Sequence, residues 1–454
     1  MMRSILASCV IPLSLLGLIA CGSNKGGDDG DGDSGTGKPD ACVGLECQVV
    51  NCAAMGQPAT SISGTVFAPN GTLPLYGITV YVPLSDPPPF SDTLACDRCE
   101  TSLPGGAVAQ ATSGEDGTFR LENVPVGANI PLVITSGKWR RKITIPNVAQ
   151  CVDAPLGAQD TRLPKNKAEG DIPKIAVTTG DADSLECLVR KLGIDDAEIT
   201  NGTGTGRIHL YRGDGVSTIT NGGAISSAVP FWDDVNNLKN YDIVFLSCEG
   251  SQQNNNSSLK TQGALDAMKA YADAGGRVFA SHWHNIWVGG NFQNNNANLA
   301  PAVWKDIATW TSSDGNPGNP IIIDEVANPK GMSFATWMLN VMGSTVRGEI
   351  QLQTNTGRAT SVTVDATKAE QWVRTRGTPP TPQMFQFTTP NEVVADQRCG
   401  KVVFSDMHVT GTSNVGMPYP ASCPGGATNV TLTPQEKALA FMFFDIASCV
   451  GGIF

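Results

Sequence analysis

Three of the four histidines in this chain directly follow short apolar runs, together with an aspartate. His282 and His284 come after the run 277–281, and Asp406 and His408 come after the run 401–405. Imidazole and carboxylate groups bind divalent metal ions, and they also act as general acids and bases. The pattern therefore predicts a metal site with ligands His282, His284 and His408, or a catalytic site formed by the same histidines and Asp406.

Two other interpretations of this region stay open. In the first, the histidines only satisfy one another and nearby backbone groups at one edge of a sheet, as remnants of an enzyme ancestor. In the second, Trp283 and Trp287, with Phe292 and the polar run 285–298, form a sugar-binding shelf, since aromatic faces stack on sugars and amides bind hydroxyls. Glu249, which follows a third apolar run, is a further candidate binding residue.

The elements that must position these residues are alternating strands and helices. Short apolar runs predict strands, and longer segments with helical spacing predict helices. The predicted strands are 174–179, 241–248, 277–281 and 401–406, and the predicted helices are 184–193, 259–274 and 433–446. Such alternation indicates an α/β domain with a parallel sheet, here 170–454, and ligands bind at the carboxyl ends of its strands.

The order of motifs in this domain resembles the class I glutamine amidotransferase-like fold, and within it the trehalose-utilisation family. The resemblance rests on the strand beginning Tyr241-Asp242, on Gly275-Gly276-Arg277 before a strand ending in histidine, and on the closing segment 400–408. It implies a flavodoxin-like parallel sheet with helices on both faces. Glutamine hydrolysis needs a cysteine on a strained elbow, where this chain has Ser281 or His282, so amidotransferase activity is not expected.

The preceding segment, 59–165, reads as an all-β domain. Short alternating strands separated by Pro, Asn, Asp and Gly turns predict a small β-sandwich. Gly64-Thr-Val, the turn and strand beginning Asp116-Gly-Thr-Phe, and Val124-Pro-Val-Gly resemble the carboxypeptidase regulatory-like, transthyretin-like domain. That resemblance implies a non-catalytic folding, spacer or binding module. The expected fold class is therefore all-β plus α/β.

The amino terminus predicts export and lipid anchoring. Residues 1–20 have the layout of a secretory signal, and Leu18-Ile-Ala-Cys21 resembles the bacterial lipobox, which implies acylation of Cys21. Residues 21–58 then form a Gly- and Asp-rich tether with a cluster of cysteines. We expect a lipid-anchored, extracytoplasmic protein of the cell envelope, at the outer membrane because no aspartate follows Cys21. The net charge of -11 argues against a nucleic-acid partner.

Cysteine counting adds two expectations. The chain has 13 cysteines; removal of Cys9 with the signal and acylation of Cys21 leave eleven, which in an exported protein should mostly form disulfides. Because eleven is odd, at least one thiol is free or pairs with another molecule. We expect Cys96 and Cys99 to be in structural disulfides rather than in a redox or zinc motif, and Cys248 to pair with Cys187.

Across nearly all of the mature chain, the sequence resembles a group of myxobacterial lipoproteins of unknown function. The similarity is carried by Gly137-Lys-Trp-Arg-Arg, Leu246-Ser-Cys-Glu-Gly, Ala280-Ser-His-Trp-His and Gln435-Glu-Lys-Ala-Leu, among other segments. We expect a binding or accessory module for carbohydrate or another surface partner, and not an enzyme. The alternative is a metal-assisted extracytoplasmic hydrolase that uses His282, His284, Asp406 and His408.

Overall fold

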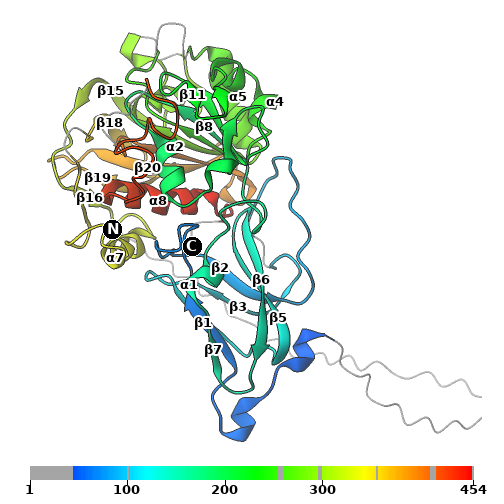
Figure 1. The fold of residues 1–454 in the computed structure, drawn as a ribbon. Helices are drawn as coiled ribbons and strands as arrows, with labels where there is room; N and C mark the ends of the chain where they lie inside the picture. The colour runs from blue at the N-terminus through cyan, green and yellow to red at the C-terminus, as the bar shows by residue number, and fades with distance from the viewer. Residues whose placement is uncertain are drawn as a thin grey trace, which may run out of the picture. The chain divides into compact units, whose positions relative to one another are not determined.

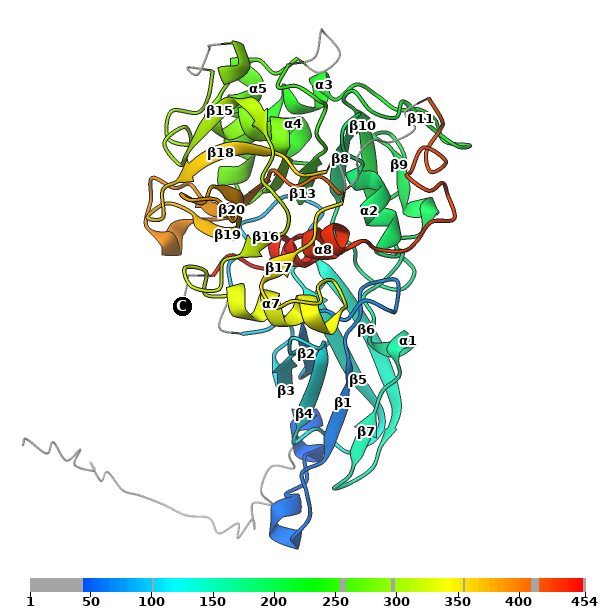
Figure 2. The same cartoon turned by 90° about the vertical axis from the view of Figure 1, so that its left-hand side faces the viewer.

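The computed structural model describes residues 44–99, 102–253, 259–294, 299–353, 356–409 and 416–451. All of these described residues belong to one compact unit. The predicted signal peptide, the lipidated Cys21, most of the tether and Cys42 lie outside the described residues. A mixture of all-β and α/β structure is confirmed (Figures 1 and 2). Within the described ranges, no helix is both long and apolar enough to cross a bilayer.

The N-terminal part is a sandwich of two small sheets. The three-stranded sheet has the order β4 (Thr118–Glu122), β1 (Ser61–Thr65), β7 (Asp153–Pro155). The four-stranded sheet has the order β3 (Ala107–Thr112), β2 (Thr79–Pro83), β5 (Gly127–Ser136), β6 (Trp139–Val148). Inward-facing residues such as Ile62, Leu121 and Leu132 are fully buried, as the predicted alternation of apolar and polar residues requires.

The C-terminal part is built on a ten-stranded sheet whose first half is parallel. Its parallel strands, in spatial order, are β9 (Ile199–Asn201), β10 (Ile208–Arg212), β8 (Ile175–Thr179), β13 (Ile243–Leu246), β14 (Arg277–Ser281) and β21 (Gly400–Ser405). From β8 the chain passes to the edge strand β9, returns to β10 beside β8, and then crosses to β13 on the other side of β8. The order of strands therefore switches between β8 and β13, which is where doubly wound sheets bind ligands.

The second half of this sheet is antiparallel and was not predicted. Its strands are β20 (Pro382–Thr389), β19 (Glu370–Arg374), β16 (Ile321–Ile323) and β17 (Glu349–Ile350). Parallel strands need long crossovers that are usually helical, whereas antiparallel strands can be joined directly by turns. The segment 341–405 contains no α-helix in its described residues, so its strands return antiparallel. A separate two-stranded sheet pairs β15 (Ala308–Gly315) with β18 (Ala359–Val364).

Helices cover both faces of the large sheet. Along β13, Ile243 and Phe245 belong to one apolar cluster, while Val244 and Leu246 belong to another, because successive strand residues point to opposite faces. The first cluster includes α2 (Leu185–Lys191), α7 (Gly331–Asn340) and α8 (Pro434–Ala447), and the second includes α3 (Val229–Trp232), α4 (Val235–Leu238), α5 (Gln262–Asp273) and α6 (Ile286–Gly289). Helix α8 begins with the predicted capping box of Thr433 and Glu436.

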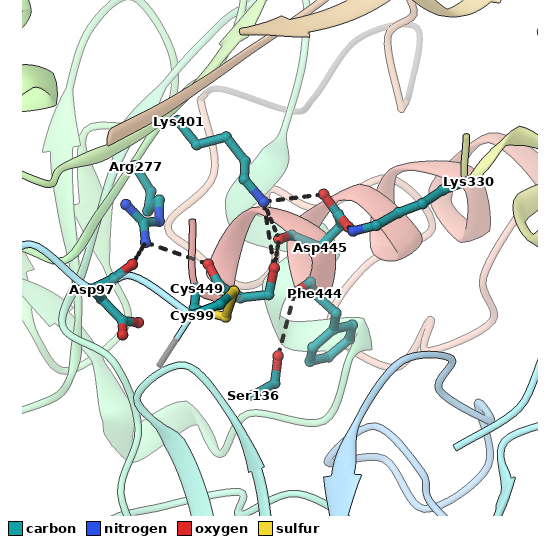
Figure 3. Close-up of a disulfide and its surroundings, with 10 residues drawn as sticks. Asp97, Cys99, Ser136, Arg277, Lys330, Lys401, Phe444, Asp445 and Cys449 are labelled. Atoms are coloured by element: carbon teal, nitrogen blue, oxygen red, sulfur yellow. Dashed lines mark hydrogen bonds and ion pairs between the residues drawn. A yellow bond between two sulfur atoms is a disulfide. The ribbon is translucent and has the colours of Figure 1, made fainter. Parts of the chain in front are cut away.

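The sandwich and the α/β part share one apolar core. Buried sandwich residues belong to the same cluster as Phe441 and Phe444 of α8. The ring of Tyr76 stacks on Phe441 at a centroid distance of 5.9 Å, and Trp139 lies 6.0 Å from Phe444. Ser136 in β5 also donates a hydrogen bond to the Phe444 carbonyl, as Figure 3 shows.

Four disulfides in which both cysteines are described join segments that are far apart in the sequence. The bonded pairs are Cys52–Cys151, Cys96–Cys399, Cys99–Cys449 and Cys187–Cys423. The expectation for Cys96 and Cys99 is confirmed, whereas the expected Cys187–Cys248 pair is wrong because Cys187 of α2 is bonded to Cys423. Among the described cysteines, Cys248 has a free thiol, which agrees with the odd count. This number of disulfides indicates that the chain folds outside the reducing cytoplasm.

Two disulfides join the β2–β3 connection to the residue before β21 and to the segment after α8, and removing both should destabilise the protein markedly. Serine in place of Cys96, Cys99, Cys399 and Cys449 is expected to lower the free energy of unfolding by about 2–5 kcal/mol. Removing one of these disulfides should lower the free energy of unfolding much less than removing both, because the remaining disulfide still closes nearly the same loop. Denaturant unfolding of the two double variants and the quadruple variant checks this; equal losses in all three would contradict it.

Candidate metal centre

Three parallel strands bring the candidate site together at one edge of the sheet. Strands β13, β14 and β21 run side by side with Leu246, Ala280 and Phe404 in register. The chain leaves these strands toward the same edge, so the residues that follow them meet there. The side chains that converge are Cys248, His282 and His408.

The cluster is compact and closed to solvent. The distance from Cys248 Sγ to His282 Nδ1 is 3.3 Å, and the rings of His282 and His408 lie 5.0 Å apart. One candidate ligand atom from each residue lies within 4.8 Å of the other two. All three residues are at most 1% exposed. A thiol and two imidazoles at this spacing form a set of ligands for a transition metal.

The backbone at His282 is unusual for a residue with a side chain. Its φ of 46° is in the left-handed region, where residues other than glycine are strained. The chain then turns directly into the short helix η4 (His282–Asn285) rather than remaining extended. Consequently His282 and His284 do not share a face, contrary to the expectation from an extended strand.

His284 is therefore turned away from the cluster and is fully hydrogen-bonded. Its Nε2 donates to the Ser247 carbonyl at 2.8 Å, and its Nδ1 accepts from Trp287 Nε1 at 2.8 Å. With both ring nitrogens engaged, His284 has no free lone pair for a metal. The structure thus brings two of the three predicted histidine ligands together, with Cys248 in place of the third.

Asp406 is also separate from the cluster. Its carboxylate accepts hydrogen bonds from the backbone N–H of Thr360 and of Ser361, at 2.8 and 3.0 Å, and from the Thr360 hydroxyl at 2.6 Å. These bonds use its oxygens to hold β18 against the end of β21. In this geometry Asp406 positions the two-stranded β15–β18 sheet, and it acts on His282 through its charge without belonging to the cluster.

A carboxylate that the sequence analysis did not identify lies behind His282. Asp314, at the end of β15, has Oδ1 3.5 Å from His282 Nε2, and its Oδ2 is 3.1 Å from Arg358 Nε. Histidines that bind metals commonly present their second ring nitrogen to a carboxylate, which orients the ring. Nothing in the sequence pairs Asp314 with His282, because the contact depends on how the β15–β18 sheet folds over the strand ends.

The two histidines of the cluster differ in charge. Burial alone would lower the pKa of His282, but the neighbouring Cys248 sulfur and Asp314 raise it to about 10. Burial and the nearby His282 lower the pKa of His408 well below its usual range, so its ring is neutral at physiological pH. Within the described part of the chain, neither ring nitrogen of His408 has a hydrogen-bond partner. A buried imidazole without partners is costly, and each such group calls for an explanation.

The residues predicted to bind sugar are buried instead of exposed. Trp287 is 1% exposed and Trp283 is 5% exposed. The Trp287 ring packs in parallel with His284 and edge-on against Trp232. Glu249 forms a buried ion pair with Lys260, with 2.7 Å between Oε2 and Nζ. These side chains do not form the predicted solvent-facing shelf, because they fill the space under the strand ends.

Comparisons with known proteins give local similarities only. No protein-family model matches the chain. A cell surface glycoprotein of Haloarcula japonica is 35% identical over 99 residues, which span 22% of this chain and 11% of the glycoprotein.

Three solved structures are similar to parts of the chain, each with a TM-score below 0.5. A cytoplasmic protein from Salmonella typhimurium has a TM-score of 0.31 and 14% identity, covering 61% of this chain and 99% of that one. A putative ThuA-like protein from Bacteroides uniformis has a TM-score of 0.28 and 10% identity, covering 60% and 91%. A cohesin–X-dockerin complex from Acetivibrio cellulolyticus has a TM-score of 0.16 and 15% identity, covering 31% and 75%.

Proposed function

We propose that this protein is a lipid-anchored protein of the cell envelope whose α/β part binds a transition-metal ion through Cys248, His282 and His408. The observation that supports the proposal most is the pairing of a free thiol with two buried imidazoles, one of which lacks any hydrogen-bond partner among the described residues. A metal ion bound to His408 would satisfy one of its nitrogens.

The donor set fits zinc or copper. A thiolate with two imidazoles is a soft to borderline set, whereas calcium and magnesium prefer oxygen ligands. His282 also has the supporting carboxylate typical of metal-binding histidines, Asp314. When bound by three protein ligands, such an ion can polarise a small fourth ligand. We propose metal binding, and not hydrolysis, as the function, because all three ligand side chains are closed to solvent and a substrate has no access to them.

The proposed location rests on three separate observations. The lipobox-like segment ending at Cys21 indicates acylation, and the four disulfides indicate an oxidising compartment. Part of the chain is also similar to a cell surface glycoprotein. A sugar-binding role receives no support from the buried tryptophans, so the metal site is the basis of the proposed function.

Metal binding can be tested with the purified mature protein. We expect about one equivalent of zinc or cobalt per chain, with a cobalt–thiolate absorption band, because three ligands converge at a single place. His408→Leu should weaken binding by more than about 100-fold, because a ligand is lost, and should keep or raise the stability of the metal-free protein by removing an unpartnered polar group.

His209, the fourth histidine of the chain, provides the matched control for the His408→Leu variant. His209 is buried as well, but its Nδ1 and Nε2 are bonded to the Tyr241 hydroxyl and the Gly206 carbonyl. His209→Gln should therefore reduce stability and leave metal affinity unchanged. Absence of stoichiometric metal in the wild-type protein, or equal affinity in the His408→Leu variant, would refute the proposal.

A further inference from the structure

The connection between β8 and α2 contacts the segments that bear all three candidate ligands. It lies at the switch in strand order, beside β13. The backbone N–H of Ala182 donates to the Cys248 carbonyl at 3.1 Å. Gly180 packs so closely that a Cβ there would lie 2.1 Å from the same carbonyl oxygen. The connection is therefore packed directly against the Cys248 backbone and hydrogen-bonded to it.

Asp183, the last residue but one before α2, reaches the other two segments. It is fully buried, and its Oδ2 accepts a hydrogen bond from the Ser281 hydroxyl at 2.7 Å. Its Oδ1 accepts from the backbone N–H of Val409 at 3.1 Å and of Ser184 at 3.0 Å. Ser281 directly precedes His282, and Val409 directly follows His408. One carboxylate thus joins the two histidine-bearing segments.

We propose that Asp183 is a positioning residue that sets the spacing between His282 and His408 in the metal centre. This inference rests on the metal site proposed above. Asp183 itself does not belong to the cluster of candidate ligands, so it acts through Ser281 and Val409.

The strained backbone at His282 explains why such a residue is needed. A left-handed conformation at a histidine persists only where neighbouring contacts determine it. The bond from Ser281 to Asp183 holds the residue immediately before the strained one, and it does so in the protein interior, where no water competes. Without this bond the 281–282 peptide can relax, and His282 Nδ1 would leave its place 3.3 Å from Cys248 Sγ.

The test compares three variants by cobalt and zinc titration, with metal-free stability measured alongside. Asp183→Ala removes all three hydrogen bonds and is expected to weaken metal affinity roughly 10–100-fold, with a shifted cobalt–thiolate band at saturating metal. Asp183→Asn keeps an acceptor for both backbone N–H groups, and its amide can donate to Ser281, so it should largely restore affinity. Ser281→Ala removes only the bond next to His282 and should shift the cobalt band at nearly unchanged stability.

The outcomes separate this inference from the function on which it depends. If wild-type protein binds no metal, the proposed function fails. If wild-type protein binds metal and both Ser281→Ala and Asp183→Ala keep its affinity and its cobalt spectrum, the positioning role is refuted. If Asp183→Ala does not fold, Ser281→Ala decides the question alone. His209→Gln is the control for general loss of stability, and its spectrum should match that of the wild type.

Discussion

Replacing Lys260 by methionine is expected to lower the free energy of unfolding by about 3–5 kcal/mol, because it leaves a buried carboxylate without its counter-ion. Lys260 Nζ lies 2.7 Å from Glu249 Oε2, and the two side chains are 1% and 0% exposed. The ammonium group also lies 4.9 Å from the centre of the Trp232 ring. The packing is tight around Glu249, since a Cβ on Gly213 would lie 2.1 Å from its Oε1. Denaturant unfolding of the wild type and Lys260→Met measures this loss of unfolding free energy.

Removing both charges should restore most of the stability. In the Lys260→Met and Glu249→Gln double variant no buried charge remains, and replacing a whole buried pair is often nearly neutral. Lys269→Met is the matched control, because Lys269 pairs with Asp273 and Glu392 on a more exposed surface and such pairs contribute less than about 1 kcal/mol each. A double variant as unstable as Lys260→Met would show that the charge pair is not the cause.

The same double variant tests the role of Glu249. Sequence analysis identifies Glu249 as a candidate binding residue because it follows a buried strand. In the structure its carboxylate pairs with Lys260, and Glu249 does not belong to the cluster of Cys248, His282 and His408. We therefore expect the double variant to keep wild-type affinity for zinc. If the double variant has restored stability but weaker metal affinity, Glu249 takes part in metal binding after all.

Four of the six parallel strands, and the edge of the sheet that carries the site, could be predicted from the sequence, whereas β9 and β10 were not predicted. Apolar runs at 174–179, 241–248, 277–281 and 401–406 match β8, β13, β14 and β21, because strands covered on both faces are nearly continuous apolar runs. Residues that follow such strands lie at one edge of the sheet, which is why His282 and His408 could be selected. In the antiparallel part, β16 and β17 have only three and two residues, and β19 and β20 contain several polar residues. The pairing of these strands depends on contacts distant in sequence.

The composition of the cluster could not be predicted, for three separate physical reasons. Cys248 was assigned to a disulfide because pairing was argued only from neighbouring strands, whereas Cys187 is bonded to a cysteine 236 residues away. His284 was included because the backbone was expected to stay extended, whereas the left-handed φ of His282 starts a helical turn. Asp314 belongs to the separate β15–β18 sheet, and no local pattern places it near a histidine.

The second large effect is expected at Asp445 in α8, where the carboxylate stabilises two lysines beside the Cys99–Cys449 disulfide (Figure 3). Its oxygens lie 2.6 Å from Lys330 Nζ and 3.3 Å from Lys401 Nζ. Arg277 lies in the same interior region and donates to the backbone carbonyls of Gly275, Asp97, Cys399 and Ser448. Asp445 is therefore the anion that offsets the charge of Lys401, which is 6% exposed.

Asp445→Asn should cost about 3–5 kcal/mol at neutral pH, because the Lys401 ammonium stays buried without an anion. Burial alone would raise the pKa of Asp445, but Lys401 and Lys330 lower it to about 2, compared with 3.8 for an ordinary aspartate. A carboxyl group whose pKa is lower in the folded state stabilises the protein above its unfolded pKa. That contribution, about 2 kcal/mol, is lost as the pH falls from about 4 to 2.

The difference in unfolding free energy between the wild type and Asp445→Asn should therefore be largest above pH 5 and shrink in acid. Denaturant unfolding at several pH values measures it, with the difference between variants removing the contribution of other carboxylates. Lys330→Met is the control, because the Lys330 side chain is 48% exposed and Asp445 still pairs with Lys401 in that variant. If the difference in unfolding free energy between the wild type and Asp445→Asn does not change with pH, Asp445 stabilises α8 by packing. In that case the burial of Lys401 does not depend on the charge of Asp445.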